Sequence, residues 1–365
     1  KTTTRTSSWR YAAAWAAMPF GEYAERYVDR RAGAISAATV ANERRYLEYA
    51  KATIGAIPLK ELVAEDVERC VLAVPRLSRE WAEERTRRLE ENRERLRREG
   101  RLKRRDPLKP PRVAGPAMQS KVLKFVREVL NDAVDREHVG RNVAKKRFLS
   151  KGFKKGRPLV DPLMEDEAGR FLEQASLLPL GMTKVAVLLL FSTGMRPEEM
   201  LALRVGTFVP AEDGGDAQVR IVAAQRAGRI EGYTKSDSSM RTVPVDRYTA
   251  SVVEAWIEEK RRALGEMGLV LRSSTPLLGE AGNPWGYNSF KKRWNAFVRK
   301  AGFAGTRPYA LRHTFATRCI EVGFEIKSLS EILGHASPRF TLERYVHASL
   351  DLKRDNMNKL AAIGY

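Results

Sequence analysis

Three of the four histidines of this chain gather in one segment with an arginine and a tyrosine. The segment reads PYALRHTFATRCIEVGFEIKSLSEILGHASPRFTLERYVHAS, and it contains Arg312, His313, His335 and Tyr345. An arginine can bind a phosphate through two parallel hydrogen bonds, an imidazole can donate a proton, and a tyrosine hydroxyl can attack as a nucleophile. Together these groups would suit phosphoryl transfer, whereas each of them alone is more often a satisfied polar residue of a buried helix.

The composition indicates that the partner of this chain is a polyanion. Lysine and arginine total 66 residues against 45 aspartates and glutamates, which gives a net charge of +21 and a pI near 10.1. Nucleic acid is favoured over an acidic membrane surface, since no apolar run reaches the ~18 residues that span a bilayer and no signal-peptide pattern is present. Cys70 and Cys319 lack a metal-ligand spacing and are typical of a protein from a reducing cytoplasm. The sequence begins at Lys1 rather than at a methionine, so it need not include the native N-terminus.

A change of composition predicts two modules. The stretch RNVAKKRFLSKGFKKGR, from Arg141 to Arg157, is basic and contains glycine, and prolines follow it, as is typical of a linker. The predicted parts are residues 1–18, an N-terminal linker or the remnant of another element; 19–145, a helical module with a charged insert at about 76–112; 146–162, a basic linker; 163–350, the second module; and 351–365, a C-terminal tail.

The pattern of the N-terminal module predicts four helices. FGEYAERYVDRR places apolar residues at helical spacing, and a second helix that is capped by Ser36 is expected to end at Gly55. The segment LKELVAEDVERCVLAV predicts a third helix that ends at the break of Pro75. The fourth helix is expected over residues 117–138, with apolar side chains along one face.

The charged insert permits two interpretations. Its sequence, RLSREWAEERTRRLEENRERLRREGRLKRRD, mixes glutamate and arginine, which favours a solvated helix with ion pairs between residues four apart. Its excess of arginine would also suit an arm that contacts phosphates. The basic residues that we predict to contact DNA from the insert and the linker are Lys103, Arg104, Arg105, Lys145, Lys146, Lys154 and Lys155.

The second module is predicted to be mostly helical with one small antiparallel sheet. The runs VRIVAA and YTKSDSSMRTVPV alternate or are β-branched, and polar turns at Gly228 and at residues 236–239 separate their strands. Helices are expected at residues 164–174, 183–192, 196–203, 248–264 and 287–301, before the histidine-rich segment.

Four blocks of the second module resemble the tyrosine recombinase or phage integrase family, and the resemblance covers nearly the whole chain from about Phe20. STGMRPEEMLALR resembles the first arginine motif of the family, which implies that Arg196 is a catalytic arginine and that Glu199 supports it. YTKSDSSMRTVPV resembles the β-hairpin of the family and puts Lys235 in the position of the catalytic lysine.

The remaining two blocks supply the rest of the implied active site. PYALRHTFAT resembles the H-x-x-R block, which implies that Arg312 is the second catalytic arginine and that His313 supports the site. LGHASPRFTLERYVH resembles the final block, with His335 at the second histidine position and Tyr345 as the nucleophile. Tyr309 stands where the family usually has histidine. A phenol, with a reference pKa of ~10, is a poorer proton carrier, but it can assist by hydrogen bonding a phosphate oxygen.

The resemblance implies a fold and a reaction. The fold would be mainly α with a small antiparallel β-sheet, as a two-domain clamp in which a helical core-binding domain and a catalytic domain close on double-stranded DNA. The reaction would cleave and rejoin DNA strands through a 3′-phosphotyrosine intermediate, without a metal or another cofactor. The resemblance also implies self-assembly on DNA as a tetramer, an accessory directionality factor and a prokaryotic cytoplasm. The long chain and its insert resemble a mobile-element or prophage integrase more than a chromosome-dimer resolvase.

Two other functions stay open at the level of the sequence. One is a topoisomerase-like enzyme that nicks and closes DNA with the same nucleophile. The other is an accessory or regulatory DNA-binding protein with weak or lost cleavage, for which Tyr309 would be the sign.

Overall fold

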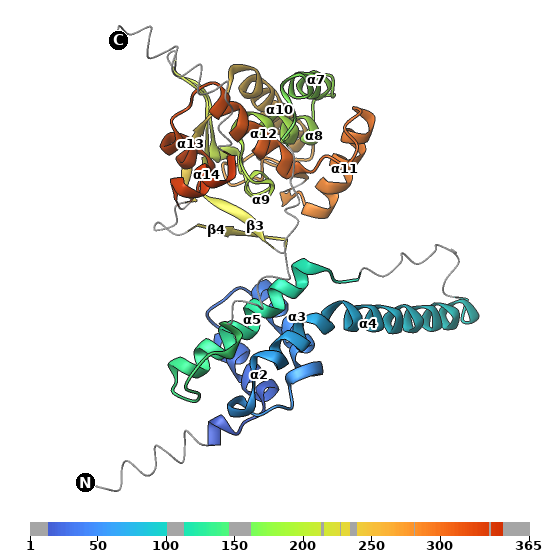
Figure 1. The fold of residues 1–365 in the computed structure, drawn as a ribbon. Coiled ribbons are helices and arrows are strands. Elements are labelled where there is room, and N and C mark those ends of the chain that lie inside the picture. Colours follow the sequence, from blue (N-terminus) through green and yellow to red (C-terminus); the bar gives the residue numbers. More distant parts are fainter. Residues whose placement is uncertain are drawn as a thin grey trace, which may run out of the picture. The chain divides into compact units, whose positions relative to one another are not determined.

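The chain forms two compact units in the computed structural model, Lys1–Arg157 and Pro158–Tyr365 (Figure 1). The structure describes residues 14–100, 113–145, 162–212, 215–226, 228–233, 239–280, 282–335 and 337–345, without the side chains of residues 340 and 343–345. Both units are rich in helices, and the strands form small antiparallel sheets in the second unit. The prediction of a mainly helical fold with a small antiparallel sheet is confirmed.

The first unit is built on four long helices, as predicted. They are α2 (Phe20–Arg31), α3 (Ala37–Ile54), α4 (Ala64–Arg98) and α5 (Pro116–Asp135), with short 3-10 turns η1 (Leu59–Glu61) and η2 (Val143–Lys145). The Oγ atom of Ser36 accepts a hydrogen bond from the Thr39 amide at 3.2 Å, so the predicted N-cap of α3 is present. The core of the unit lies between these helices and includes Phe20, Tyr23 and Phe125, each fully buried.

Residues 14–18, which the sequence assigned to a linker or to the remnant of another element, pack on this unit. The indole of Trp15 stacks on the imidazole of His138 with 4.8 Å between the ring centroids. The guanidinium of Arg26 lies 5.2 Å from the centroid of the same indole, and the Leu59 amide donates to the Met18 carbonyl oxygen at 3.0 Å. The described end of the predicted linker is therefore part of the helical unit.

Helix α4 passes through Pro75 without a break, so the prediction that a helix ends there was wrong. A proline inside a helix has no N–H to donate to the carbonyl four residues before it, here that of Val71. The Nε2 atom of Gln119, on the neighbouring helix α5, donates to this carbonyl at 3.1 Å in a buried position. The side chain of Gln119 thus satisfies the acceptor that Pro75 leaves without a backbone partner.

We predict that Gln119→Met destabilises the first unit by about 1–3 kcal/mol, because the buried Val71 carbonyl loses its donor. In a Pro75→Ala background the new backbone N–H can bond to the same carbonyl, so the cost of Gln119→Met should fall to less than half. Urea titration with hydrogen exchange read on peptides of residues 1–157 measures both costs. Lys121→Met, on the exposed face of α5, is the control, and equal costs in the two backgrounds would refute this account.

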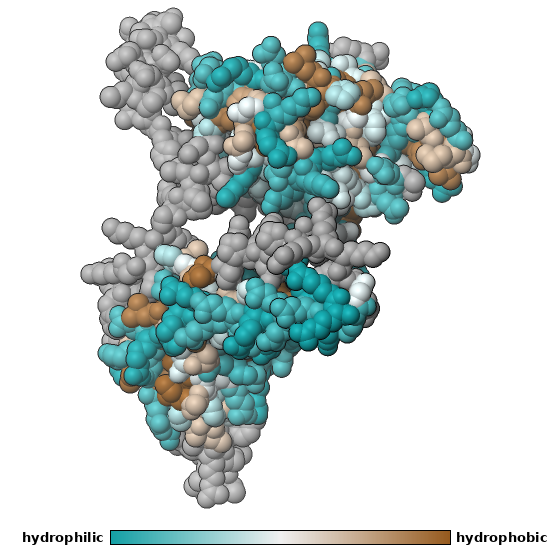
Figure 2. Space-filling view, turned by 90° about the vertical axis from the view of Figure 1, so that its right-hand side faces the viewer, coloured by the Kyte–Doolittle hydropathy of each residue, from teal (hydrophilic) through white to brown (hydrophobic). Residues whose placement is uncertain are grey.

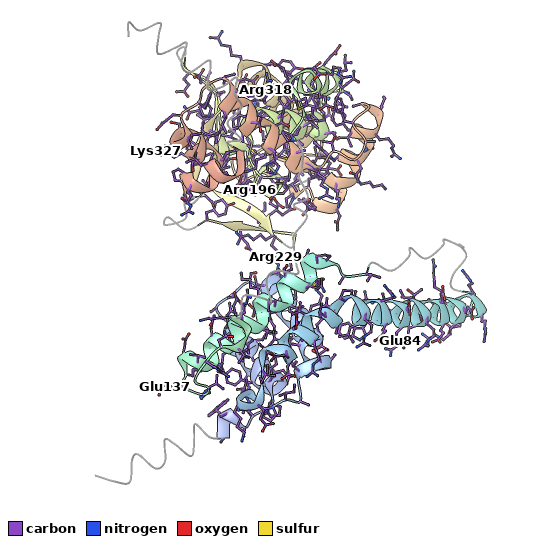
Figure 3. All side chains as sticks on the ribbon, viewed as in Figure 1. Glu84, Glu137, Arg196, Arg229, Arg318 and Lys327 are labelled. Carbon is purple, nitrogen blue, oxygen red and sulfur yellow. The ribbon has the colours of Figure 1, made fainter. Side chains whose placement is uncertain are left out.

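The residues after Pro75 continue α4 as a charged, solvated helix. Figure 1 shows this part of α4 running on past α2, α3 and α5. Trp81 still packs on Tyr49, with 4.7 Å between their ring centroids, but most later side chains are exposed. Ion pairs within the helix join Arg76 to Glu80 at 2.7 Å and Arg88 to Glu84 at 2.7 Å. Figure 3 shows Glu84 on this part of α4. The first interpretation of the insert therefore fits residues 76–98, and residues 101–112 lie outside the described part of the chain.

The described residues of the second unit form helices and three small sheets, with β3 and β4 at one edge of the unit (Figure 1). The helices are α7 (Glu165–Ser176), α8 (Met182–Thr193), α9 (Pro197–Met200), α10 (Arg247–Glu266), α11 (Tyr287–Lys300), α12 (Pro308–Glu321), α13 (Ile326–Leu333) and α14 (Pro338–Tyr345), with the 3-10 turn η3 (Val205–Thr207). Helix α9 is shorter than the predicted helix of residues 196–203. The apolar helix α8 supplies much of the core, since Val185, Val187 and Leu189 are fully buried.

The strands of this unit pair more extensively than predicted. The strands are β1 (Phe208–Val209), β2 (Gln218–Ile221), β3 (Ala223–Arg226), β4 (Arg229–Gly232), β5 (Arg241–Pro244), β6 (Gly279–Glu280) and β7 (Asn283–Pro284). The sheets have the orders β1-β2-β5, β3-β4 and β6-β7, all antiparallel, and Val219 lies opposite Val243. Pairing between the two predicted runs is therefore correct, but one sheet was predicted where the described residues form three.

Hydrophilic side chains cover most of the face that Figure 2 shows. Figure 2 shows one face of the molecule, on which hydrophilic residues predominate in both units and hydrophobic residues form small separate patches. No helix among the described residues is long and apolar enough to cross a membrane.

Candidate active site

Two arginines lie side by side because consecutive backbone carbonyls hold them. The carbonyl oxygen of Leu333 accepts a hydrogen bond from Nη2 of Arg312 at 2.7 Å, and that of Gly334 accepts one from Nη2 of Arg196 at 3.1 Å. These carbonyls lie at the C-terminal end of α13, where the last carbonyls lack helical donors and carry partial negative charge. The turn after α13 therefore places two guanidinium groups next to each other.

Arg312 is buried on α12, with 4% of its surface exposed. Its Nη1 donates to the Gly194 carbonyl oxygen at 3.0 Å, so Arg312 also contacts the C-terminal end of α8. Gly194 has φ of +60°, and a Cβ there would lie 2.4 Å from a ring carbon of Phe315, so glycine is required for both reasons. The guanidinium of Arg312 is thus fixed by the ends of two helices.

Arg196 stands at the start of α9, and the spacing R-x-x-E explains its geometry. Glu199 lies one turn later, so its Oε2 accepts from the Arg196 backbone N–H at 2.8 Å while its Oε1 accepts from Nη1 of Arg196 at 2.7 Å. The side chain of Arg196 is 28% exposed, whereas that of Glu199 is fully buried. Arg196 lies close to β3 (Figure 3) and can present a guanidinium edge to a ligand.

Glu199 holds a second arginine that the motif analysis did not identify. Nη2 of Arg241 donates to Oε2 of Glu199 at 2.8 Å and Nη1 donates to Oε1 at 3.1 Å, and the Tyr233 hydroxyl donates to Oε1 at 3.2 Å. Burial would raise the pKa of Glu199, but the hydrogen bonds from Arg241 and the charges of Arg241 and Arg196 lower this pKa to about 2. Glu199 is therefore an anion that two guanidinium groups share.

The hydrogen bonds of His335 define its tautomer. Nε2 of His335 lies 2.8 Å from Nη2 of Arg312, and because a guanidinium only donates, Nε2 must accept. The ring proton is then on Nδ1, which donates to Oγ1 of the fully buried Thr341 at 2.8 Å. In this arrangement His335 has a lone pair, not a proton, on the nitrogen that faces Arg312.

The hydroxyl of Tyr309 is hydrogen-bonded to a carboxylate in this structure. It donates to Oε2 of Glu198, on α9, at 2.9 Å. Burial, together with the charge of Glu198 and this hydrogen bond, raises the pKa of Tyr309 well above its ordinary value. The sequence predicted that Tyr309 assists at a phosphate oxygen, but a proton that is donated to Glu198 is not available to a phosphate.

The remaining predicted residues have varied positions. Tyr345 is the last residue of α14, and the side chain of Tyr345 is not among the described atoms. Lys235 lies outside the described residues. His313 is 8% exposed on α12. Lys145 is exposed at the end of η2. The other predicted DNA-contacting residues, Lys103, Arg104, Arg105, Lys146, Lys154 and Lys155, also lie outside the described residues.

Sequence reasoning missed Arg241, Tyr233 and Thr341. Arg241 and Tyr233 belong to the run YTKSDSSMRTVPV, whose alternation after the turn puts one face of β5 towards the interior. An arginine on the same face of this strand as the buried Val243 was a signal that a carboxylate lies nearby. Thr341 gave no comparable signal, since threonine is common at exposed positions of short helices.

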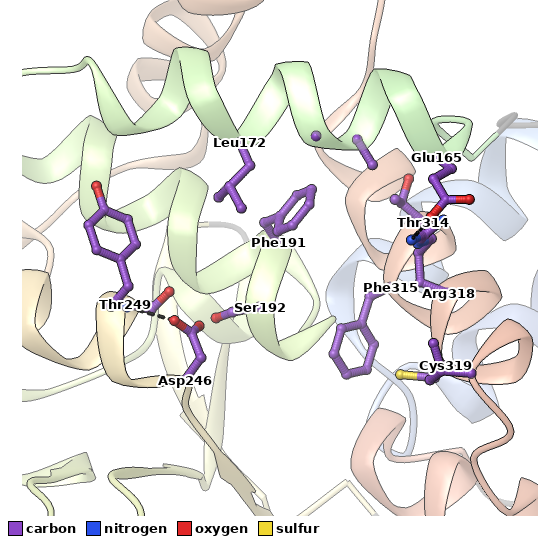
Figure 4. Close-up of a pocket in the computed structure, with 14 residues that line it drawn as sticks. Glu165, Leu172, Phe191, Ser192, Asp246, Thr249, Thr314, Phe315, Arg318 and Cys319 are labelled. Atoms are coloured by element: carbon purple, nitrogen blue, oxygen red, sulfur yellow. Dashed lines mark hydrogen bonds and ion pairs between the residues drawn. The ribbon is translucent and has the colours of Figure 1, made fainter.

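A cavity of about 800 Å³ has neither Arg196 nor Arg312 among its lining residues. Apolar side chains line much of it, including Leu172, Phe191 and Phe315, and the ion pair between Arg318 and Glu165, at 2.9 Å, lies at its edge (Figure 4). Among the residues that the structure describes, no group of three or more His, Cys, Asp or Glu side chains is placed to hold a metal ion. Within the described part of the second unit, several polar groups converge around Arg196 and Arg312.

Comparison with known proteins identifies relatives of the second unit. The model of the phage integrase family matches residues 162–351. The tyrosine recombinase XerD of Oceanobacillus iheyensis is 29% identical over 198 residues, which are 54% of this chain and 60% of that protein. The tyrosine recombinase XerC of Bacillus licheniformis is 28% identical over 199 residues, 53% of this chain and 58% of that protein. The chain thus spans about three fifths of these relatives.

Solved structures share the fold of both units at low sequence identity. The Tn1549 transposon integrase in complex with transposon right end DNA has a TM-score of 0.69 and 18% identity, and the match covers 94% of this chain and 100% of that one. A lambda integrase dimer bound to a COC′ core site has a TM-score of 0.56 and 11% identity, with 91% of this chain and 97% of that one covered. Since the family model matches more than half of the residues, the chain belongs to the phage integrase family of tyrosine recombinases.

Proposed function

We propose that this chain is a site-specific DNA recombinase that cleaves and rejoins strands through a 3′-phosphotyrosine intermediate. The observation that carries the proposal is the pair of consecutive carbonyls, Leu333 and Gly334, that holds Arg312 and Arg196 side by side. Two adjacent guanidinium groups match the two non-bridging oxygens of one phosphodiester. Because both arginines have fixed partners before a substrate arrives, they need little reorganisation to stabilise the charge of the transition state.

The proposed reaction begins with attack by the Tyr345 hydroxyl oxygen on the scissile phosphorus. A bond forms between this oxygen and phosphorus, and the bond from phosphorus to the 5′-oxygen breaks. The phenol proton leaves to a base, and Nε2 of His335 can accept it once the hydrogen bond from Nη2 of Arg312 to that nitrogen is broken. Lys235 donates the proton that the departing 5′-oxygen needs. In the second half, a 5′-hydroxyl attacks the phosphotyrosine and releases Tyr345, so no net hydrolysis occurs.

The biological setting that we propose is a mobile-element or prophage integrase in a prokaryotic cytoplasm. The fold similarity to the Tn1549 transposon integrase and the long extension of α4 support a mobile element over chromosome-dimer resolution. The net charge of +21 supports duplex DNA as the partner. We further propose that the two units act as a DNA clamp, that recombination takes place in a tetramer, and that an accessory factor sets its direction. Residues 146–162 would be the basic linker between the units.

A covalent adduct with DNA tests the proposed chemistry. Duplexes that the protein binds are first selected from the DNA that flanks its gene and from a random library, and a nick is then moved through each bound duplex. A nick beside the scissile phosphate lets the short cleaved strand diffuse away, so the phosphotyrosine accumulates and is detected on a denaturing gel. We expect an adduct with the wild type and none with Tyr345→Phe, which should bind the same duplexes with similar affinity.

Two results would overturn the proposal. One is the absence of an adduct with the wild type at every nick position in duplexes that it binds. The other is an adduct that persists in Tyr345→Phe, which would assign the attack to another residue.

The Tyr309–Glu198 hydrogen bond favours a second candidate function, an accessory DNA-binding protein with weak cleavage. In that case the occupied hydroxyl would mark a site that has lost efficient proton transfer. Slow or absent cleavage by a protein that binds its selected duplex tightly would support this function over the first.

We predict that Tyr309→Phe slows single-turnover cleavage by less than ~10-fold, because the proton of Tyr309 is donated to Glu198. Glu198→Gln should have a larger effect in the wild type than in Tyr309→Phe, since the two side chains act as a pair. Tyr248→Phe, an exposed tyrosine of α10, is the matched control. A loss of 100-fold or more in Tyr309→Phe would mean that its hydroxyl turns to the phosphate during the reaction.

A further inference from the structure

Arg241, at the start of β5, joins three segments of the second unit. Its Nε donates to the carbonyl oxygen of Ile332 at 2.5 Å, and its Nη1 donates to that of Ser239 at 2.9 Å. Nη1 and Nη2 also donate to the two carboxylate oxygens of Glu199 at 3.1 and 2.8 Å. The side chain is 6% exposed, and each of its three nitrogens has a partner within the protein. Arg241 is therefore not available to contact a substrate.

Arg241 touches both groups that hold Arg196. The first is the carboxylate of Glu199, which accepts from Nη1 of Arg196 at 2.7 Å. The second is Gly334, whose carbonyl oxygen accepts from Nη2 of Arg196 at 3.1 Å. Arg241 packs so closely on Gly334 that a Cβ there would lie 2.8 Å from Nη1 of Arg241. Arg241 therefore contacts both of the groups that set the direction of the Arg196 guanidinium.

The chemistry of Arg241 suits this task. A guanidinium binds a carboxylate through two parallel hydrogen bonds, which sets the plane of the carboxylate as well as its position. A lysine could offset the charge of Glu199, but it has no planar fork with which to fix that plane. Since the two oxygens of Glu199 serve Arg196 and Arg241 together, a rotated carboxylate would turn the guanidinium of Arg196 as well.

We propose that Arg241 is a positioning residue for Arg196, which it aims by fixing Glu199 and the turn at Gly334. The inference rests on the proposed function, because the phosphate that Arg196 would bind belongs to that reaction. Arg241 also stands six positions after Lys235 in the sequence, so the competing account is that it acts on the leaving group through Lys235. The two accounts differ in whether the effect of Arg241 depends on protonation of the leaving 5′-oxygen.

Two DNA substrates separate these accounts. One has the normal 5′-oxygen at the scissile phosphate, and the other has sulfur in its place. A thiolate leaves without being protonated, since a thiol has a pKa of ~8.5, so the sulfur substrate does not need Lys235. We expect the single-turnover cleavage rate of Lys235→Ala to return towards the wild-type rate on the sulfur substrate. We expect Arg241→Met to slow single-turnover cleavage of both substrates by the same factor, about 100-fold, and Arg241→Lys to restore part of the rate.

A double-mutant cycle tests whether Arg241 acts through Arg196. In an Arg196→Lys background, adding Arg241→Met should lower the single-turnover cleavage rate by less than a further ~5-fold, because the guanidinium that Arg241 positions is already absent. Affinity for the uncleaved duplex should change by less than ~3-fold in Arg241→Met. Arg262→Met, which removes an exposed arginine of α10 with ion pairs to Glu259 and Glu266, is the matched control and should cleave at the wild-type rate.

Recovery of Arg241→Met on the sulfur substrate, or additive effects in the cycle, would overturn the proposal. A crystal structure of Arg241→Met without DNA gives a test that does not depend on activity. We expect Arg196 to lose its contact with Glu199 or with Gly334 in that structure. If Arg196 keeps both contacts, the positioning role is refuted even if the protein cleaves DNA. If the wild type itself forms no adduct while Arg196 moves as expected, the proposed function fails and the positioning role stands.

Discussion

Arg312→Met is expected to lower the single-turnover cleavage rate by about 1,000-fold, as the loss of a preorganised group that stabilises transition-state charge generally does. It should also destabilise the second unit by about 2–4 kcal/mol. The carbonyls of Gly194 and Leu333 would lose buried donors, each worth ~1–3 kcal/mol, and methionine can replace only the volume of the side chain. Single-turnover cleavage and urea titration, with hydrogen exchange read on peptides of residues 158–365, measure the two effects.

Arg318→Met is the matched control for Arg312→Met. Arg318 lies on the same helix, α12, but its side chain is 33% exposed and its partners are the surface carboxylates of Glu165 and Glu321. Surface ion pairs contribute ~0–1 kcal/mol, so this variant should be close to the wild type in stability and in cleavage. Equal destabilisation by the two substitutions would show that the carbonyl contacts of Arg312 contribute nothing specific.

Glu199→Gln is expected to destabilise the second unit by about 3–5 kcal/mol at pH 7. Arg241, with 6% of its side chain exposed, and the partly buried Arg196 would then lack their shared counter-charge, and an uncompensated buried charge is strongly destabilising. Urea titration with the same peptide readout measures this cost. Glu231→Gln, which removes an exposed partner of Arg226 on β4, is the control and should cost less than ~0.5 kcal/mol.

The same substitution should change the pH dependence of stability. The pKa of Glu199 falls from an ordinary value of 4.5 to about 2 on folding, because the charges and hydrogen bonds of the two arginines outweigh burial. A lowered carboxyl pKa stabilises the folded state fully above pH 4.5, and this stabilisation is lost as the pH falls from 4.5 towards 2. The loss is on the order of 3 kcal/mol and should be absent in Glu199→Gln. If the stability of Glu199→Gln falls between pH 4.5 and pH 2 by as much as that of the wild type, this explanation is contradicted.

Contacts within one helical turn agree with what the sequence indicated. The family resemblance implied that Glu199 supports Arg196, and the spacing R-x-x-E explains the contact, because it puts Glu199 one helical turn after Arg196. The cap of α3 at Ser36 has the same origin. In both cases the partners lie within four residues, so the chain has few ways to arrange them.

Contacts between distant segments could not be predicted in this way. Arg241 meets Glu199 across 42 positions, and the partner of Val71 is Gln119 on another helix. The rule that proline ends a helix failed at Pro75 because tertiary packing supplied the donor that the backbone lacked. The contact between the Tyr309 hydroxyl and Glu198 could not be predicted for the same reason, since nothing in the local sequence indicates that Glu198 lies within reach of Tyr309.

The arginine pair depends on main-chain carbonyls, and every type of residue has one. Mutational drift along the exposed face of α13 can therefore change side chains without removing the acceptors that hold Arg196 and Arg312. The tolerance ends at Gly194 and Gly334, where φ values of +60° and +64° and the close packing of Phe315 and Arg241 exclude a side chain. In a saturation library of this region, most of the sequence constraint on the site should be concentrated at these two glycines and at the charged residues themselves.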